Sequence, residues 1–511
     1  MPSTARMSAP LPLSREDAAT LLDSLDEYRL YVAANRGPVH HSIRGGRLEA
    51  RPAAGGLVTA LTSVADYFPL IWVAAPSGDG DRLVGEVCAL GRPLPGSPRV
   101  KYAAVPEDAL ARSYHHFSNP ILWFLQHGMY DRLHSTSLAQ LESGWMLGYR
   151  PVNRAFTEAI EQEISDVTRP IVLTQDYHLY LLPSLLRRRR PDALIQHFTH
   201  IPWPGPDHWL RLSPSIRGEL HQGLLGADVI GFQTHDSVHN FIRTCELFVP
   251  GVRVDHSQDT VWLYGHRTRV RSYPISVDPA SLRRSAALPA TRDYVARLRP
   301  RLGKRTIVRV DRMDPSKNIA LGFRAFGLLL ERRPDLVGTV RYLAFLVPSR
   351  EGILEYRRYA AEVSKEIERV NGRFGRGAWR PIELFCEDNR AQAIAGMALA
   401  DVVLVNPVAD GMLQLAWTGE PVEHVVVETA AEPTAQIVRK FSPCGPCLTI
   451  GKLVRETAKF YVYRKWLGCS DDGYVYETEE RRIGKSSLVH TEPCRCCRDH
   501  AETSYPNGYM D

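Results

Sequence analysis

The sequence predicts an α/β protein with two Rossmann-like domains, each a parallel, doubly wound sheet, and a cleft between them. Short apolar runs alternate with amphipathic helical patterns from about residue 29 to residue 405, as is typical of such sheets. Polar and charged residues follow several of these runs directly, where the carboxyl ends of parallel strands meet. A Pro- and Arg-rich helical stretch over residues 278–302 separates two series of strands. We expect a small-molecule site where the two domains face each other.

The first series of strands begins after a predicted N-terminal helix. Ser14 is placed as the N-cap of that helix, with Asp17 at its third position, and the helix is expected to end near Glu27. Gly55-Gly56 opens a second helical pattern, Leu57 to Val64. The predicted strands of this part are residues 29–34, 70–73, 170–174, 193–198, 228–232 and 272–275.

The second series starts near Thr306, and a helical pattern over residues 319–330 follows its first strand. Further strands are expected at residues 342–346, 382–385 and 402–405. After about Gly411 the alternation weakens, and residues 459–492 indicate a β-hairpin because aromatic and polar residues alternate there. The predicted parts are an N-terminal helix (1–28), a first Rossmann-like domain (29–277), a second, incomplete one (278–425) and a Cys-rich tail (430–511).

The composition is that of an ordinary globular protein. The 511 residues carry 63 Lys and Arg against 57 Asp and Glu, and a net charge of +6 is too slight for this length to indicate a nucleic-acid partner. Residues 1–12 lack the apolar segment of a signal peptide, and no apolar run reaches the roughly 18 residues of a membrane helix. We expect a cytoplasmic protein without a membrane partner, and a homo-oligomer is compatible with the sequence.

The segment from Arg309 to Asn318 carries the most chemical information. Arg312 and Lys317 stand between a predicted strand and a predicted helix, at the mouth of an α/β sheet. The planar fork of an arginine and the compact charge of a lysine together suit a diphosphate. The alternative is a solvated loop that carries two unrelated cations, which are common on protein surfaces.

Other strand ends add polar residues to this pair. They are Asn35, Arg36, Asp176, His178 and His200 in the first domain and Arg350 and Asp410 in the second. Gly55-Gly56 before a helix would let the main chain approach a phosphate, although most such pairs are simply turns. A single histidine such as His200 is commonly a structural residue. Asp176 and His178 supply two metal ligands with no third nearby, which is a weak indication of a metal site.

Taken together, these motifs resemble the trehalose-6-phosphate synthases, which are retaining glycosyltransferases of the two-Rossmann (GT-B) fold. The most specific motif is Asp176-Tyr177-His178-Leu179, running into His200-Ile201-Pro202-Trp203-Pro204. The resemblance covers about residues 30–412. The other stretches that carry it are residues 34–38, 55–57, 114–123, 149–156, 225–232, 310–312, 348–350, 371–375 and 400–412.

The resemblance implies transfer of glucose from a nucleotide-glucose, typically UDP-glucose, to glucose-6-phosphate with retention. The product is α,α-trehalose-6-phosphate, and no catalytic cofactor or metal ion is implied. Arg312 and Lys317 then bind the donor diphosphate, and Gly56 belongs to a glycine loop over the phosphates. The remaining roles carried over are acceptor-phosphate binding by Arg36, Tyr114, Trp123 and Arg350, substrate binding by Trp72, contact with the acceptor glucose by Asp176, and contact with the transferred glucose by His200 and Asp410.

The chain departs from the family pattern after Met412. In the family this segment leads to a glutamate that holds the donor ribose, whereas Thr418 stands at that position here and Glu420 is the nearest carboxylate. The departure keeps an alternative open. The chain would then be a degenerate homologue or pseudo-glycosyltransferase that binds sugar phosphates, or an enzyme that couples a different acceptor.

Six of the nine cysteines lie in residues 444–497. Two C-x-x-C pairs flank the predicted hairpin, a spacing that resembles a zinc ribbon with four thiolates around one structural Zn. The alternative is an unstructured or unrelated tail. The predicted ligands are Cys444, Cys447, Cys494 and Cys497, and His500 is a substitute ligand.

Overall fold

The structure is a computed structural model in which the chain divides into two compact units. The first is formed mainly by Met1–Ser276, and the second mainly by Val277–Ala409 and the chain from Gln414 onward. The residues described are 30–53, 57–58, 61, 70–89, 99–135, 137–275 and 279–410, together with the strands at 425–427, 451–456, 460–470 and 473–484. Among them, no helix combines the length and the apolar character needed to cross a membrane.

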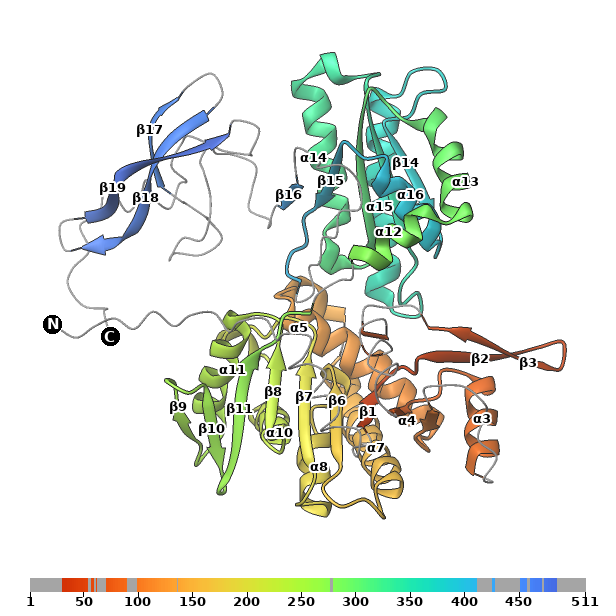
Figure 1. Cartoon of the computed structure of the whole chain (residues 1–511), viewed down its shortest axis with the longest axis vertical. Helices are drawn as coiled ribbons and strands as arrows, with labels where there is room; N and C mark the ends of the chain where they lie inside the picture. The colour runs from red at the N-terminus through yellow and green to blue at the C-terminus, as the bar shows by residue number, and fades with distance from the viewer. Residues whose placement is uncertain are drawn as a thin grey trace. The chain divides into compact units, whose positions relative to one another are not determined.

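The first unit is built on a nine-stranded sheet of order β5-β4-β1-β6-β7-β8-β11-β10-β9 (Figure 1). The strands from β5 to β11 are parallel, and β10 and β9 continue the sheet in antiparallel fashion. A separate antiparallel hairpin, β2–β3, follows β1. The strands are β1 (Leu30–Ala34), β2 (Val39–Arg44), β3 (Arg47–Pro52), β4 (Leu70–Ala74), β5 (Arg99–Tyr102), β6 (Ile171–Gln175), β7 (Leu194–Thr199), β8 (Val229–Phe232), β9 (Arg253–Asp255), β10 (Thr260–Leu263) and β11 (His266–Ser272).

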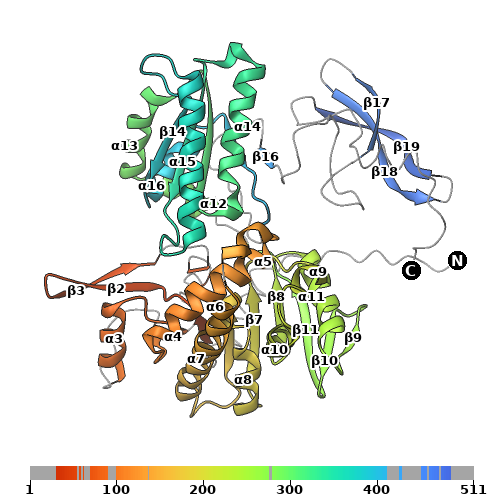
Figure 2. The ribbon, with the colours of Figure 1, turned by 180° about the vertical axis from the view of Figure 1, so that it is seen from behind.

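Helices cover this sheet, and α7 and α8 lie in front of its strands in Figure 2. Both faces of the central strands are therefore covered, as their nearly continuous apolar sequences require. All five residues of β1 and of β4 are buried. The helical segments are α3 (Asp79–Ala89), α4 (Glu107–Arg112), η1 (Ser113–Trp123), α5 (Phe124–Gln126), η2 (Tyr130–Ser135), α6 (Leu138–Ser143), η3 (Gly144–Tyr149), α7 (Arg150–Glu163), η4 (Tyr177–Leu179), α8 (Leu182–Arg189), α9 (Pro206–Trp209), α10 (Pro214–Leu224) and α11 (His235–Phe248).

The second unit contains a five-stranded, wholly parallel sheet of order β14-β13-β12-β15-β16. Its strands are β12 (Arg305–Arg312), β13 (Val340–Val347), β14 (Ile382–Cys386), β15 (Val402–Val405) and β16 (Val425–Val427). Its helical segments are α12 (Pro279–Ala287), α13 (Pro289–Leu298), η5 (Arg299–Arg301), η6 (Pro315–Lys317), α14 (Ile319–Arg332), η7 (Pro334–Leu336), α15 (Leu354–Phe374) and α16 (Arg390–Ala398).

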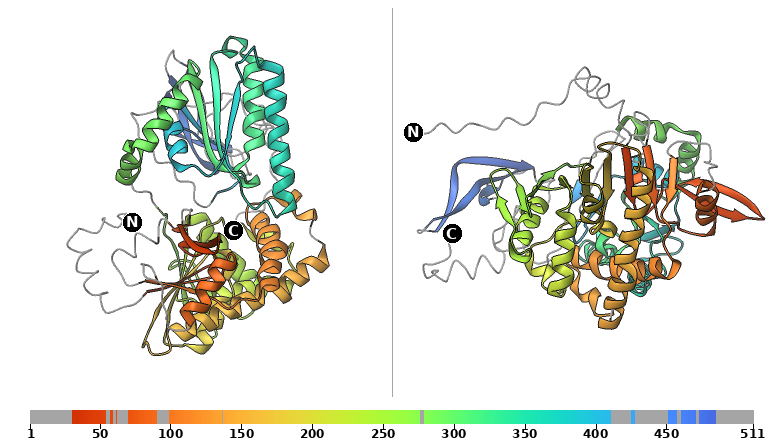
Figure 3. Two further views of the ribbon diagram at one scale, coloured as in Figure 1. Left: turned by 90° about the vertical axis from the view of Figure 1, so that its right-hand side faces the viewer. Right: turned by 90° about the horizontal axis from the view of Figure 1, so that it is seen from below.

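Alternate residues of β13 define the two faces of this second sheet. Tyr342 and Leu346 pack with α14 and α15 on one face. Leu343 and Phe345 pack with α13 and α16 on the other face. The sheet therefore lies between two helical layers, which the left panel of Figure 3 shows edge-on. Because both faces are covered, the strands carry short apolar stretches such as Leu343–Val347 and Val402–Val405, and these made them predictable.

The structure confirms most of the predicted strands and corrects one of them. The strand expected over residues 272–275 ends at Ser272 and begins at His266. Every residue of β11 except Val270 is charged or polar, which hid the strand, and Pro274 has no N–H to extend its ladder. The helical stretch over 278–302 is two helices, α12 and α13, and a short 3-10 turn.

The C-terminal hairpin is confirmed as β18 (Phe460–Ser470) and β19 (Gly473–Gly484), which pair in antiparallel fashion. A third strand that was not predicted, β17 (Gly451–Glu456), pairs with β18. In the second unit, β16 extends the parallel sheet beyond the point where the alternation of the sequence weakens. The N-terminal helix predicted over residues 14–27 lies outside the described residues.

Candidate active site

The segment after β12 is a tight turn whose shape follows from its sequence. The side chain of Asp314 caps the 3-10 turn η6 by accepting hydrogen bonds from the N–H of Ser316 at 3.0 Å and from its hydroxyl at 2.9 Å. Pro315 occupies the first position of the turn, where no N–H is needed. Asn318 adopts the left-handed conformation with φ +56°, which lets α14 begin at the next residue.

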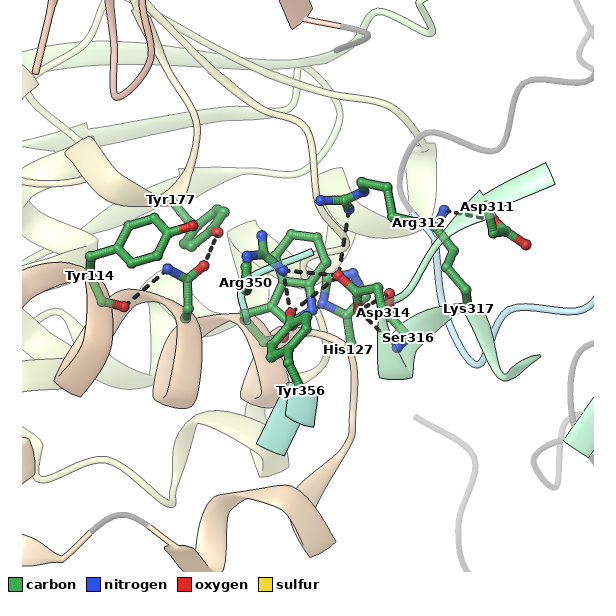
Figure 4. Close-up of polar contacts among 12 residues, drawn as sticks. Tyr114, His127, Tyr177, Asp311, Arg312, Asp314, Ser316, Lys317, Arg350 and Tyr356 are labelled. Atoms are coloured by element: carbon green, nitrogen blue, oxygen red, sulfur yellow. Dashed lines mark hydrogen bonds and ion pairs between the residues drawn. The ribbon is translucent and has the colours of Figure 1, made fainter. Parts of the chain in front are cut away.

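Two carboxylates, Asp311 and Asp314, lie close to four cations at this end of the sheet. Figure 4 shows both carboxylates with Arg312, Lys317 and Arg350. Asp311 lies 2.8 Å from Arg309 Nε and 3.9 Å from Lys317 Nζ. Asp314 Oδ2 lies 2.9 Å from Arg350 Nη1 and 3.6 Å from Arg312 Nη2. These six side chains carry four positive and two negative charges, a formal sum of +2. An anion with more than one negative charge would complete this cluster.

Arg309 anchors the segment that carries Lys317 to the strand β12, a role that was not predicted. Its side chain is fully buried, and its guanidinium donates to Asn406 Oδ1 at 2.6 Å and to the carbonyl of Lys317. A Cβ added at Gly322 would come within 2.8 Å of Arg309 Nη1, so the absence of a side chain there makes room for the guanidinium. The sequence feature that could have indicated this role is the position of a charged residue between Val308 and Val310, inside a predicted strand.

The first N–H groups of α14 are occupied by a side chain of α15. The hydroxyl of Tyr359 accepts a hydrogen bond from the N–H of Ala320 at 3.3 Å and another from that of Ile319. Burial raises the pKa of Tyr359 to about 12, so the phenol stays neutral at physiological pH. The positive charge of this site therefore comes chiefly from side chains and less from the end of the helix.

Arg350, predicted for the acceptor phosphate, lies in the second unit in a constrained position. Its side chain is 7% exposed, and its backbone has φ +49°, which is unusual for a residue other than glycine. Arg350 Nη1 also contacts the hydroxyl of Tyr356, which in turn donates to Asp314 Oδ2 at 3.1 Å. Asp314 and Tyr356 thus hold the guanidinium on two sides.

In the first unit, Arg36 and Tyr114 lie together. Arg36 is exposed just beyond β1, and its Nη2 donates to the hydroxyl of Tyr114 at 3.3 Å. Trp72, predicted to contact the substrate, is fully buried in the core. Its indole N–H donates to the carbonyl of Arg36 at 3.1 Å. This position favours a supporting role for Trp72, in which it fixes the backbone of Arg36, over direct contact with a ligand.

Aromatic rings fix the remaining predicted acceptor residues. Tyr114 is half-buried and lies parallel to His178, with 6.2 Å between ring centroids. Trp123 is 6% exposed and stacks on His127 at 4.3 Å. Asn119 Nδ2 donates to the carbonyl of Tyr114 at 3.0 Å, which steadies that part of η1. The rings leave these side chains little freedom to reorient.

Asp176 and His200 come together at the carboxyl ends of β6 and β7. Asp176 has φ +68°, a strained conformation for an aspartate, and its Oδ1 accepts a hydrogen bond from the N–H of His200 at 3.2 Å. Strained residues of this kind concentrate at functional sites. The loop after Asp176 is held by the buried Asn153, whose side chain donates to the carbonyl of His178 and accepts from the N–H of Leu181.

His200 is a neutral hydrogen-bonding group in this structure. Burial lowers the pKa of His200 to about 4. Its Nε2 lies 3.0 Å from Gln175 Oε1, an oxygen that only accepts, so the proton resides on Nε2. Nδ1 is then an acceptor, and it has no hydrogen-bond partner among the residues that the structure describes. A hydroxyl group of a ligand could donate to this nitrogen.

Acid is expected to unfold the first unit because three buried histidines stay neutral in the fold. Burial lowers the pKa of His197 to about 3 and those of His200 and His221 to about 4. Below a pH of about 6.5, which is the pKa of histidine in an unfolded chain, these three side chains bind protons in the unfolded state but remain neutral in the folded state. The free energy of unfolding should thus be highest above pH 6.5 and fall by about 2 kcal/mol per histidine on acidification to about pH 5.

Urea unfolding followed by tryptophan fluorescence would measure this loss of stability, since the ring centroids of Trp203 and His221 lie 5.3 Å apart. His221→Gln should make the pH dependence shallower. The matched control is His256→Gln, which replaces an exposed histidine paired with Glu246 and should leave the dependence intact. A free energy of unfolding that is the same at about pH 5 as above pH 6.5 would contradict the prediction.

The other predicted site residues fall at the margin of the described chain or beyond it. Asp410 is half-buried and follows β15, in a segment tied to η6 by a hydrogen bond from the N–H of Val408 to the carbonyl of Ser316 at 2.8 Å. Three residues named for the donor, Gly56, Thr418 and Glu420, lie outside the described residues. The four predicted zinc ligands, Cys444, Cys447, Cys494 and Cys497, do so too, and the zinc ribbon stays a prediction. Within the described part of the chain, no three His, Cys, Asp or Glu side chains are grouped to hold a metal ion.

Comparison with known proteins assigns the family. The family model described as glycosyltransferase family 20 matches residues 28–454 and so extends past Met412 and Glu420. An "Alpha,alpha-trehalose-phosphate synthase [UDP-forming]" of Schizosaccharomyces pombe is 30% identical over 407 residues, covering 76% of this chain and 74% of that protein. A second protein of that name, from Aspergillus fumigatus, is 32% identical over 400 residues, covering 76% and 79%.

A solved structure agrees with these sequences. It is a UDP-forming alpha,alpha-trehalose-phosphate synthase from Burkholderia xenovorans in complex with glucose-6-phosphate. It is 26% identical to this chain, with a TM-score of 0.62 over 78% of this chain and 84% of its own. The fold and the sequence point the same way, and the chain belongs to glycosyltransferase family 20.

Proposed function

We propose that this protein transfers glucose from UDP-glucose to the anomeric hydroxyl of glucose-6-phosphate with retention, forming α,α-trehalose-6-phosphate and UDP. The observation that carries the proposal is the cluster of four cations on two carboxylates at the end of β12, which has a net charge of +2. The names of the relatives, which are UDP-forming trehalose-phosphate synthases, supply the substrates. They favour this activity over a non-catalytic sugar-phosphate binder.

The donor side of the proposal is assigned mainly to the second predicted domain, residues 278–425. Arg312 is 45% exposed at the end of β12, and Lys317 is 18% exposed in η6, so both have surface to offer a diphosphate. As the bond between the glucose C1 and the phosphate oxygen breaks, negative charge grows on that oxygen. Fixed cations therefore stabilise the transition state more than the ground state. Asp410 is proposed to bind hydroxyls of the transferred glucose, and Gly56 to lie over the phosphates.

The acceptor side is assigned mainly to the first predicted domain, residues 29–277. Arg36, Tyr114 and Trp123, together with Arg350, are proposed to bind the acceptor phosphate. Asp176 would contact the acceptor glucose. The anomeric hydroxyl of the acceptor forms the new C1–O bond, and its proton passes to the departing phosphate oxygen on the same face of the sugar. Retention follows from this same-face attack.

Neutral His200 suits the transferred glucose. An uncharged imidazole with a free acceptor nitrogen can take a hydrogen bond from a sugar hydroxyl. It would add no positive charge that attracts the leaving diphosphate away from Arg312 and Lys317. The pKa of His200, lowered to about 4 by burial, keeps this state through the physiological pH range.

Release of UDP tests the proposal directly. The purified chain is mixed with UDP-glucose, and UDP is followed by a coupled enzyme assay before and after addition of glucose-6-phosphate. We expect UDP to appear only when both sugars are present, with glucose and fructose-6-phosphate as matched acceptor controls. Absence of UDP with any nucleotide-glucose would refute the proposal and leave sugar-phosphate binding as the function to examine.

A further inference from the structure

We propose that Asp314 is a positioning residue that couples recognition of the two substrates, because a single carboxylate oxygen holds both Arg312 and Arg350. The inference rests on the function proposed above, in which Arg312 binds the donor diphosphate and Arg350 the acceptor phosphate. Asp314 itself touches neither substrate. Its effect reaches them through the two guanidinium groups.

The geometry that carries this inference is confined to the second unit. Asp314 is fully buried, yet each of its oxygens is used. Oδ1 accepts from Ser316, which fixes the plane of the carboxylate. Oδ2 lies 2.9 Å from Arg350 Nη1 and 3.6 Å from Arg312 Nη2, and Figure 4 shows the carboxylate between the two arginines. The carboxylate is thus oriented by the loop before either arginine uses it.

The two arginines need such a group for a physical reason. Guanidinium groups that approach the same anion repel each other, and the repulsion is stronger where protein excludes water. Arg350 also has φ +49°, a strained conformation that persists only when its surroundings fix it. Asp314 neutralises part of the repulsion and holds the side chain of Arg350 in place. Tyr356 contacts Arg350 and donates to Asp314, so it helps to hold the side chain of Arg350. Because the phenol is uncharged, it does not reduce the repulsion between the two arginines.

Removing the charge of Asp314 should therefore weaken the binding of both substrates, while removing the hydroxyl of Tyr356 should weaken the binding of glucose-6-phosphate alone. Asp314→Asn is expected to raise the KM for UDP-glucose and the KM for glucose-6-phosphate about tenfold each, the size expected for one charge-assisted hydrogen bond. Tyr356→Phe keeps the carboxylate, so only the KM for glucose-6-phosphate should rise. A purely structural role would lower the amount of active enzyme and leave both KM values unchanged.

The chain offers a matched control for the loss of a carboxylate shared by two arginines. Glu366 on α15 accepts from Arg324 at 2.8 Å and from Arg369 at 2.8 Å, and it is 11% exposed. Glu366→Gln removes the same kind of arrangement from the surface of the α14–α15 pair. Both KM values should stay at the wild-type level in this variant.

Steady-state kinetics with each substrate varied in turn decides the matter. A rise in both KM values for Asp314→Asn, with neither raised in Glu366→Gln, supports the coupling; a change in only one KM, or in kcat alone, overturns it.

If Asp314→Asn fails to fold, Ser316→Ala serves instead, since it removes the hydroxyl hydrogen bond to Oδ1 while leaving the charge of the carboxylate and the hydrogen bond from the N–H of residue 316. A smaller rise in both KM values would then support the coupling, and unchanged values would overturn it. A wild-type chain without turnover would refute the proposed function first, and calorimetric titration of wild type and Asp314→Asn with each substrate separately would still test the coupling.

Discussion

Arg312→Ala should lower kcat/KM for glucosyl transfer by roughly 10²- to 10³-fold, the loss typical of removing one donor that stabilises a transition-state anion. Arg312 is the cation at the carboxyl end of β12, its side chain is 45% exposed, and its Nη2 lies 3.6 Å from Asp314 Oδ2. Its charge is therefore available to a diphosphate whose negative charge grows as UDP departs. The change should appear largely in kcat, because the interaction is stronger in the transition state than in the ground state.

Arg312→Lys separates charge from shape. Lysine keeps the positive charge but loses the planar fork that binds two phosphate oxygens at once, so part of the activity should return. Lys317→Ala should resemble Arg312→Ala, since the two cations are proposed to share one ligand. Activity of Arg312→Lys equal to that of Arg312→Ala would mean that geometry matters more than charge.

The matched control lies at the other end of the same strand. Arg305 is the first residue of β12, its side chain is 74% exposed, and it pairs with Asp401 at 3.1 Å. Arg305→Ala should leave kcat/KM unchanged, because exposed ion pairs contribute little and this one is remote from the carboxyl end of the strand. Equal losses in Arg305→Ala and Arg312→Ala would contradict the assignment of the diphosphate to Arg312.

Arg309→Met should destabilise the second unit by about 3–5 kcal/mol, the usual result of removing one partner of a buried ion pair. The substitution fills a similar volume but leaves Asp311, the amide oxygen of Asn406 and the carbonyl of Lys317 without their shared donor. These groups lie on the strand, the loop after β15 and η6, so the loop that carries Lys317 should loosen as well. Turnover should fall together with stability.

Hydrogen exchange of peptides from β12 and β13 would measure this loss locally. Arg333→Ala is the control, because Arg333 pairs with Asp335 at 2.7 Å on the surface, with the two side chains 60% and 58% exposed. That variant should keep wild-type protection in both strands. Protection in Arg309→Met equal to that of wild type would show that the buried arginine is dispensable for the fold.

The fold was predictable wherever burial on both faces left a simple pattern. Strands β13 and β15 are almost wholly apolar, and they appear within two residues of their predicted limits. The hairpin β2–β3 and the strand β11 were missed or misplaced because polar side chains are frequent along them. Sheet order was beyond reach, since it depends on contacts between distant segments.

The site shows the same division between local and distant information. Arg312 and Lys317 could be named because they follow a strand and precede a helix, which is a local pattern. The supporting roles of Arg309 and Asp314 could not, because their partners are remote: Asn406 is 97 residues from Arg309, and Tyr356 is 42 residues from Asp314. Trp72 was predicted to bind substrate, and its burial and its hydrogen bond to the carbonyl of Arg36 depend on contacts that the sequence does not show.

The central claim is that the chain joins the glucose of UDP-glucose to C1 of glucose-6-phosphate with retention. Nuclear magnetic resonance of the product made from UDP-glucose labelled with ¹³C at C1 of the glucose tests it most directly. We predict a single new disaccharide phosphate in which the labelled carbon is α-linked to C1 of the acceptor, formed in equal amount to UDP. A β-linkage, release of the label as free glucose, or UDP-glucose left unchanged would contradict the account.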